Sequence, residues 1–156
     1  MTKKVYTVQQ GFVKAAKFCA YQERTQAEVK QRLYEYGLWG DDAEQVIVKL
    51  IENNFINEER FARTYAGSKF RLKKWGRIKI EYALKQKGLS PYCVRAGMEE
   101  ITDEDYENTL RELLEKKISQ IKAENDFILK RKLANYALTK GYENERVWSL
   151  IEEIFA

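Results

Sequence analysis

The side chains with the clearest capacity for chemistry are the cations of residues 69–87. This stretch has eight lysine and arginine residues and a single acid, Glu81. Such a concentration of positive charge attracts phosphate or an acidic protein surface, and salt weakens the attraction. We predict a contact patch made of six of these cations and extended by two arginines of the preceding segment: Lys69, Arg71, Lys73, Lys74, Arg77 and Lys79, with Arg60 and Arg63. The alternative is a solvated helix surface whose lysines favour solubility.

A second basic group lies between residues 116 and 132, although the net charge of the whole chain is only +4. Its cations alternate with acidic residues between positions 112 and 126. Alternation of opposite charges is typical of ion pairing along a helix surface. We therefore interpret this group as structural rather than as a contact surface.

The residues needed for catalysis are scarce. The chain has no histidine, which removes the commonest general base and the commonest zinc ligand. No glycine-rich phosphate loop is present either. Cys19 and Cys93 are too few for a disulfide framework, and we predict that both are buried free thiols in helices. We expect no catalytic residue, no metal site and no cofactor, and hence a protein that is not an enzyme.

The elements that must position the basic residues are helices. One proline and eight glycines interrupt 156 residues that are rich in leucine, glutamate, lysine and alanine, a composition that favours long helices. No apolar run is long enough to span a membrane, and the N-terminal segment lacks the apolar core of a signal peptide. We expect a cytoplasmic protein without membrane contact.

A repeated helix ending divides the chain into three parts. Gly37, Gly88 and Gly141 each follow a short helical pattern and precede a large hydrophobic residue, at intervals of 51 and 53 positions. Apolar residues stand four and eight positions before each glycine, on one helix face. A longer helical pattern precedes each of these segments, and a capped one follows it. The sequence thus predicts three tandem three-helix repeats.

We predict an all-α fold in which the repeats form an elongated, curved helical array, as a monomer. The expected limits are residues 1–8 for an N-terminal tail and residues 9–54, 55–102 and 103–156 for the three repeats. Aromatic residues, Trp39, Tyr82 and Phe127 among them, should fill the cores and the junctions.

Several residues are predicted helix caps. Thr25 and Asp41 each stand three positions before a glutamate, which has the form of a capping box. Ser90, followed by Pro91, and Asn144 should open the last helices of the second and third repeats.

Three segments resemble the RecX family, the bacterial regulators of RecA recombinase. Residues 22–37 are similar to the family's Arg-Ser/Thr-x-x-Glu-Leu opening, with valine at the last position. Residues 50–62 are similar to its Asp-Asp-x-Arg-Phe-Ala segment, with Asn54 in place of a glycine and Asn57-Glu58 in place of the acidic pair. Residues 73–89, KKWGRIKIEYALKQKGL, resemble its most recognisable stretch. The resemblance runs from about residue 12 to residue 155.

The resemblance implies a regulator that binds the RecA filament on single-stranded DNA. It would inhibit or modulate the ATPase, strand-exchange and coprotease activities of the filament in recombination and DNA repair. Double-stranded DNA is a further candidate partner. The basic middle of the chain is compatible with contact to phosphate without any base-specific contact.

Two other classes of protein remain open from the sequence. One is a helix-turn-helix DNA-binding regulator, because short glycine-containing turns join the helices. Against it, the helix after Gly88 begins with residues 90–94, SPYCV, which are poorly suited to reading base edges. The other is a helical-repeat interaction scaffold without DNA contact.

Overall fold

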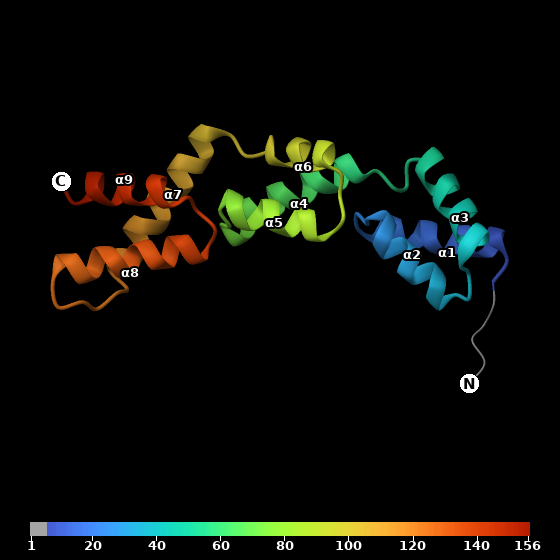
Figure 1. Cartoon of the computed structure of the whole chain (residues 1–156), viewed down its shortest axis with the longest axis horizontal. Helices are drawn as coiled ribbons and strands as arrows, with labels where there is room; N and C mark the ends of the chain where they lie inside the picture. Colours follow the sequence, from blue (N-terminus) through green and yellow to red (C-terminus); the bar gives the residue numbers. More distant parts are fainter. Residues whose placement is uncertain (1–5) are drawn as a thin grey trace.

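The computed structural model describes residues 6–156, which form nine helices and no strand (Figure 1). The helices fall into three successive groups of three, here called units 1, 2 and 3. Unit 1 holds α1 (Val8–Tyr21), α2 (Gln26–Glu35) and α3 (Gly40–Glu52); unit 2 holds α4 (Glu58–Lys73), α5 (Arg77–Gln86) and α6 (Pro91–Met98); unit 3 holds α7 (Asp103–Ile118), α8 (Asp126–Thr139) and α9 (Asn144–Ile154). The predicted all-α fold of three tandem three-helix repeats is confirmed.

The residue limits expected for the repeats stay a prediction, because the boundary between two packed units also depends on which residues unfold together. Of the expected N-terminal tail, residues 1–5 lie outside the described residues. The rest is not a tail, because Thr7 caps α1 with a capping box to Gln10 and Val8 is the first helical residue.

The repeated helix ending has the conformation that the glycine pattern predicts. Gly37, Gly88 and Gly141 have φ angles of 83°, 77° and 103°, in the region that side chains with a Cβ rarely adopt. Asn54, which stands where the related family has glycine, also takes a positive φ of 62°. Asparagine tolerates this conformation better than most residues.

The predicted caps are confirmed in part. The hydroxyl groups of Thr25 and Ser90 accept hydrogen bonds from the backbone N–H groups three residues further on. The predictions for Asp41 and Asn144 are wrong. α3 begins at Gly40, so Asp41 lies in the first turn, where its carboxylate complements the helix dipole instead of capping. Asn144 is likewise the first residue of α9.

The three units do not have three separate cores. Unit 1 buries its own cluster, which includes Val29, Leu33, Val46 and Leu50. Units 2 and 3 share one continuous cluster, and every helix pair with extensive contact still lies within a unit. The shared core therefore passes through the junction residues rather than through helix–helix packing between the units.

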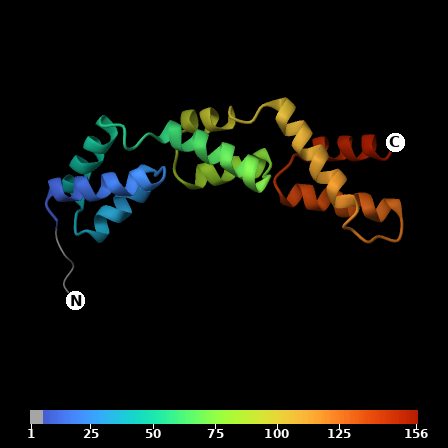
Figure 2. The same ribbon diagram turned by 180° about the vertical axis from the view of Figure 1, so that it is seen from behind.

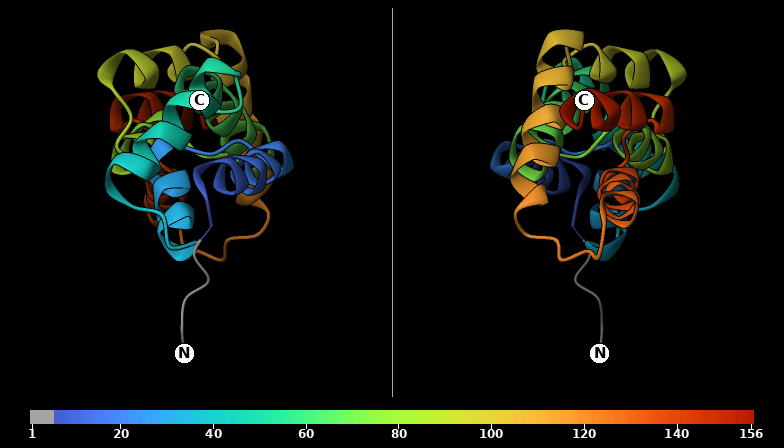
Figure 3. Two further views of the ribbon diagram at one scale, coloured as in Figure 1. Left: turned by 90° about the vertical axis from the view of Figure 1, so that its right-hand side faces the viewer. Right: turned by 90° about the vertical axis from the view of Figure 1, so that its left-hand side faces the viewer.

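The units follow one another along a gently curved rod with units 1 and 3 at opposite ends (Figures 1 and 2). The end-on views show a cross-section that is narrow compared with the length of the rod (Figure 3). This arrangement confirms the predicted elongated array. Three aromatic residues expected in the cores instead point to solvent: Trp39, Tyr82 and Phe127 are 64%, 65% and 68% exposed. No helix among residues 6–156 is both long enough and apolar enough to cross a membrane.

Candidate nucleic-acid interface

Most of the cations predicted to form the patch lie at the turn between α4 and α5. α4 ends at Lys73, and Lys74 takes a left-handed conformation with φ 60° that reverses the chain. α5 begins two residues after Trp75, at Arg77. The last turn of α4 and the first turn of α5 therefore place their cations at one end of unit 2. Lysine in the last turn of a helix is favourable for the helix dipole, so the same residues stabilise the element that presents them.

Two lysines of this patch lie against the Trp75 ring. The Lys69 Nζ is 5.0 Å and the Lys79 Nζ 4.6 Å from the ring centroid. Contacts of this length are typical of cation–π attraction, which holds an ammonium group in place without neutralising it. Lys73, Lys74, Lys79 and Arg71 are exposed to solvent.

Unit 3 brings two further lysines to the same place: Lys117, whose alternating charge pattern predicts a structural helix surface, and Lys140, which the sequence does not single out. The Lys117 Nζ lies 4.6 Å and the Lys140 Nζ 5.7 Å from the centroid of the Tyr136 ring. The Lys140 ammonium also donates a hydrogen bond of 3.2 Å to the carbonyl oxygen of Lys73. We call Lys69, Lys79, Lys117 and Lys140, with the rings of Trp75 and Tyr136, the junction cluster.

Backbone contacts fix the junction cluster in register. The Gly76 N–H donates to the carbonyl oxygen of Lys140 at 2.7 Å, and the Ile78 N–H donates to that of Gly141 at 3.0 Å. A Cβ at Gly76 would overlap the backbone of Gly141, which explains why glycine occupies this position. Burial, together with the charges of Lys79 and Lys117, lowers the pKa of Lys140. The ammonium groups of units 2 and 3 are therefore close enough to repel one another.

Three of the four arginines of the predicted site have partners inside the protein. Arg60 Nε lies 2.7 Å from Glu23 Oε2 of unit 1, and Arg63 lies 3.4 Å from both Glu99 and Glu100 at the end of unit 2. Arg77 Nη2 lies 2.8 Å from Asp103 Oδ1 and donates to the carbonyl oxygen of Ile101 at 3.0 Å. These guanidinium groups hold the units and their connections together.

The lysines of the predicted site, and Arg71 with them, differ from these three arginines in this respect. Within residues 6–156, ion pairs engage none of the side chains of the following group: Lys69, Arg71, Lys73, Lys74, Lys79, Lys117 and Lys140. Five of the eight predicted residues are thus cations without a carboxylate partner, and the other three are paired inside the protein. Lys69 and Lys73 share one face of α4, whereas the Arg71 guanidinium lies against Gly67 on another face.

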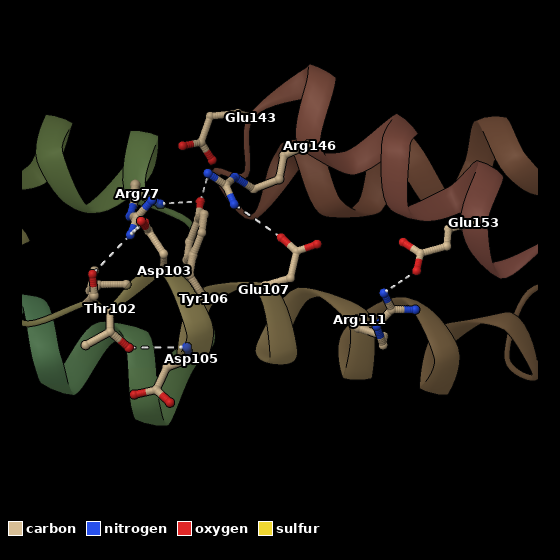
Figure 4. A network of polar contacts seen from close by, with 11 residues as sticks. Arg77, Thr102, Asp103, Asp105, Tyr106, Glu107, Arg111, Glu143, Arg146 and Glu153 are labelled. Carbon is tan, nitrogen blue, oxygen red and sulfur yellow. Dashed lines mark hydrogen bonds and ion pairs between the residues drawn. The ribbon is translucent and has the colours of Figure 1, made fainter.

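Figure 4 shows the polar contacts that join units 2 and 3, together with two ion pairs inside unit 3. The Tyr106 hydroxyl donates to Glu143 Oε1 and accepts a hydrogen bond of 2.9 Å from the Arg77 N–H. Arg146 pairs with Glu107 at 3.2 Å, and Arg111 pairs with Glu153 at 3.0 Å. Burial, with the nearby Glu143 carboxylate, raises the pKa of the Tyr106 hydroxyl far above its ordinary range. The hydroxyl therefore stays a donor.

A hollow near the patch lies between units 1 and 2. It has a volume of about 360 Å³ and is lined by Glu23, Glu28, Tyr65, Lys69 and Lys87 among others. Within the described residues, one oxygen of Glu23 is buried there without a hydrogen-bond partner. Among residues 6–156, no three histidine, cysteine, aspartate or glutamate side chains are arranged to hold a metal ion.

The arrangement suits electrostatic contact with a chain of phosphates. Ammonium groups bind phosphate without directional demands, whereas sequence readout needs bidentate groups presented to base edges. The exposed cations of the patch are lysines except for Arg71, which is the one predicted arginine without an ion pair. The geometry therefore favours backbone contact over base recognition.

Comparison with known protein families gives one consistent result. Three family models match, described as the first, second and third three-helix domains of RecX, at residues 12–50, 57–98 and 103–151. Together they cover the larger part of the chain, and each falls within one of the three units.

Individual relatives agree with the family models. A "Regulatory protein RecX" from Clostridium perfringens is 35% identical over 133 residues, which are 84% of this chain and 62% of the relative. Another from Clostridium tetani is 31% identical over 157 residues, which are 97% of this chain and 72% of the relative. The chain thus spans less than two thirds of the length of the Clostridium perfringens relative.

The fold also matches a solved structure. The crystal structure of RecX from Lactobacillus salivarius aligns with a TM-score of 0.86 at 24% identity and covers 95% of this chain and 96% of that one. A likeness at this identity shows the fold.

Proposed function

Because the chain belongs to the RecX family of regulatory proteins, we propose that it binds a RecA filament on single-stranded DNA and inhibits its ATPase, strand-exchange and coprotease activities. The protein acts by contact and performs no chemistry of its own. Lys69, Arg71, Lys73, Lys74 and Lys79 contact the DNA backbone or an acidic surface of the filament. Arg60, Arg63 and Arg77 support this surface from behind through their internal partners. Double-stranded DNA is a weaker partner through the same lysines.

One observation carries the proposal: exposed cations without carboxylate partners lie at the middle of a narrow three-unit rod. A narrow rod can lie along a helical filament and contact more than one protomer, whereas a compact domain of the same size covers a single patch. Phosphate contact from the middle unit leaves both outer units available for protein surfaces.

The helix-turn-helix alternative receives little support from the same geometry. α6 begins at Pro91, and the exposed large side chain of its first turn is Tyr92, 63% exposed. Base readout in the major groove needs arginine, asparagine or glutamine near the start of a recognition helix. We therefore propose a regulator that contacts the DNA backbone.

The test is to add the purified protein to RecA on single-stranded DNA and to follow ATP hydrolysis and strand exchange at several salt concentrations. We expect inhibition that weakens as salt rises. The double variant K73E/K74E should lose most of the inhibition while keeping its helix content. The matched control K17E/K122E has the same change in charge at two exposed lysines outside the patch and should inhibit like the unchanged protein.

Unchanged ATPase and strand exchange at equimolar protein would contradict the proposal as a whole. Equal inhibition by K73E/K74E and by the control would instead show that another surface makes the contact.

A further inference from the structure

The cationic surface does not end with unit 2. Lys79 of α5, Lys117 of α7 and Lys140 at the end of α8 come from three helices and two units, yet they meet at the junction. A Cβ at Gly141, the residue after Lys140, would overlap Lys79, and Lys117 and Lys140 lie over the same Tyr136 ring. The Lys140 ammonium uses one of its three N–H donors on the carbonyl oxygen of Lys73, at the C-terminal end of α4. That bond ties a unit 3 lysine to the helix that presents Lys69 and Lys73.

Like charges held together oppose folding unless something else offsets their repulsion. In the described part of the chain, no carboxylate pairs with Lys69, Lys79, Lys117 or Lys140. Other carboxylates near the junction do have partners. Asp103 pairs with Arg77, Glu107 pairs with Arg146, and Glu143 accepts a hydrogen bond from the Tyr106 hydroxyl. These acids thus have partners of their own and do not pair with the four lysines.

Two aromatic rings organise these cations. Trp75 lies under Lys69 and Lys79, and Tyr136 lies under Lys117 and Lys140. Both rings are half-buried, and Trp75 packs against the shared core of units 2 and 3. The cations are spread around two rings rather than converging on one point, which suits a succession of phosphates better than a single one.

We infer that units 2 and 3 together form a composite binding site for the sugar–phosphate backbone of a nucleic-acid strand, in which Lys117 and Lys140 are binding residues as much as Lys69 and Lys79. The inference rests on the proposed function and deepens it, because it assigns unit 3 a part in nucleic-acid contact. The site is complete only while the units are docked through Gly76 and Gly141.

The test measures how the affinity for fluorescein-labelled oligothymidylate depends on salt. Each phosphate contact with a single strand contributes about 0.7 to the slope of log K against log salt. The double variant K117Q/K140Q should therefore lower the slope by about 1.4, so that a fourfold rise in salt costs the unchanged protein about sevenfold more affinity than the variant.

The matched control is K116Q/K122Q, which removes the same charge from the residue next to Lys117 and from the exposed loop after α7. Its slope should stay within error of the unchanged protein. K117R/K140R keeps both charges and should keep the slope as well. Circular dichroism and thermal unfolding show whether each variant is folded.

The outcomes separate the inference from the function on which it rests. Equal slopes for K117Q/K140Q and K116Q/K122Q would overturn the composite site, even if RecA inhibition is observed. A selective fall in the slope supports the site, even if RecA activity proves insensitive to the protein. Competition by inorganic phosphate at concentrations as low as those of oligothymidylate phosphate would overturn the strand as ligand in favour of a single phosphate.

Discussion

Tyr106 of α7 connects units 2 and 3 through both its ring and its hydroxyl group. Its ring packs on Tyr142 at a centroid distance of 4.9 Å and lies 6.0 Å from Phe70 of α4. Its hydroxyl accepts a hydrogen bond from the first N–H of α5, at Arg77, and donates one to the carboxylate of Glu143, just before α9. An amide at a helix start has no partner within the helix, so Tyr106 supplies from unit 3 what α5 lacks in unit 2.

We expect Y106F to lower the free energy of unfolding by about 1–2 kcal/mol, because it keeps the ring and leaves two polar groups without a partner. Urea denaturation with an unchanged m-value measures the loss. Y82F is the control, since the Tyr82 side chain is 65% exposed and its change should stay within about 0.5 kcal/mol. Equal stability of both variants would mean that water replaces the hydroxyl at no cost.

Cys19 and Cys93 differ in their surroundings although both are free thiols. Burial raises the pKa of the Cys19 thiol from 9.0 to about 11, Glu23 adds to the rise, and Arg24 and Arg60 oppose it. The thiolate fraction at pH 8 is then about 100-fold lower than for an ordinary cysteine. We expect iodoacetamide to alkylate Cys93 well before Cys19 in the folded protein, as followed by mass spectrometry.

The same shift has a defined sign for stability. A thiol whose pKa is higher in the folded state favours folding below its unfolded pKa, and the effect disappears as the pH rises towards 11.

The control for the alkylation experiment is the unfolded protein: in urea both cysteines should react with iodoacetamide at similar rates. Equal rates in the folded protein would show that α1 opens more readily than its buried face suggests.

The sequence locates the cationic surface but cannot say which cations are free to use it. Lys73 and Arg77 look equivalent in a string of basic residues, yet Arg77 binds Asp103 and a backbone carbonyl. Ion pairs depend on which distant segments meet, and residue type and spacing carry no such information. The sequence does not single out Lys140 for the same reason, because only the docking of units 2 and 3 brings its ammonium group to the carbonyl oxygen of Lys73.

At the scale of elements, two helix endings with the same local geometry have different surroundings. Gly88 and Gly141 each follow the end of a helix, and both have a positive φ. A Cβ at Gly88 would meet nothing within 4 Å, whereas one at Gly141 would overlap Lys79. The pair therefore separates the cost of backbone conformation from the cost of docking two units.

We expect G88A to lower the free energy of unfolding by about 1–2 kcal/mol, the cost of a left-handed alanine. G141A should cost about 1–3 kcal/mol more, because the added methyl group also forces the junction apart. Chemical denaturation of both variants gives the difference directly. A cost for G141A no greater than that for G88A would show that the junction yields without loss.

Helix identity is largely local, which is why the repeat was visible in the sequence. An aliphatic residue every three or four positions and a closing glycine suffice to define α2, α5 and α8. Cap positions depend on more than residue type: Asp41 has the residue type of a cap, but α3 starts earlier, with Trp39 as its N-cap. The burial of Leu38 immediately before it leaves little chain between the core and the helix, so packing decides where the helix begins.

At the scale of the whole molecule, the two junctions between units differ in kind. Units 2 and 3 share a hydrophobic core. Unit 1 has its own core and meets unit 2 through polar contacts: Arg60 with Glu23 at 2.7 Å, Lys87 with Glu28 at 3.5 Å, and the Gln26 N–H with Glu58 at 3.1 Å. A three-part repeat in the sequence gives no hint of this asymmetry, because the repeated positions describe the interior of each unit.

Polar contacts at a surface contribute little stability and weaken as salt rises. Unit 1 should therefore move as a body relative to a rigid pair formed by units 2 and 3, and its freedom should depend on ionic strength. Such freedom would let the rod adapt to the pitch of a filament while the composite site between units 2 and 3 keeps its geometry.

We expect E23Q/E28Q to loosen unit 1 without unfolding it, since it removes both carboxylates of the ion pairs across the first junction. Small-angle scattering should show a broader distribution of interatomic distances, and the unchanged protein should approach it in about 1 M salt, where screening acts within about 3 Å. The control E107Q/E153Q removes two ion pairs inside unit 3 and should scatter like the unchanged protein. Hydrogen exchange within the helices should be equal in E23Q/E28Q and the unchanged protein, because each unit keeps its core. Identical scattering of all three proteins at low and high salt would mean that unit 1 is held by contacts other than these ion pairs.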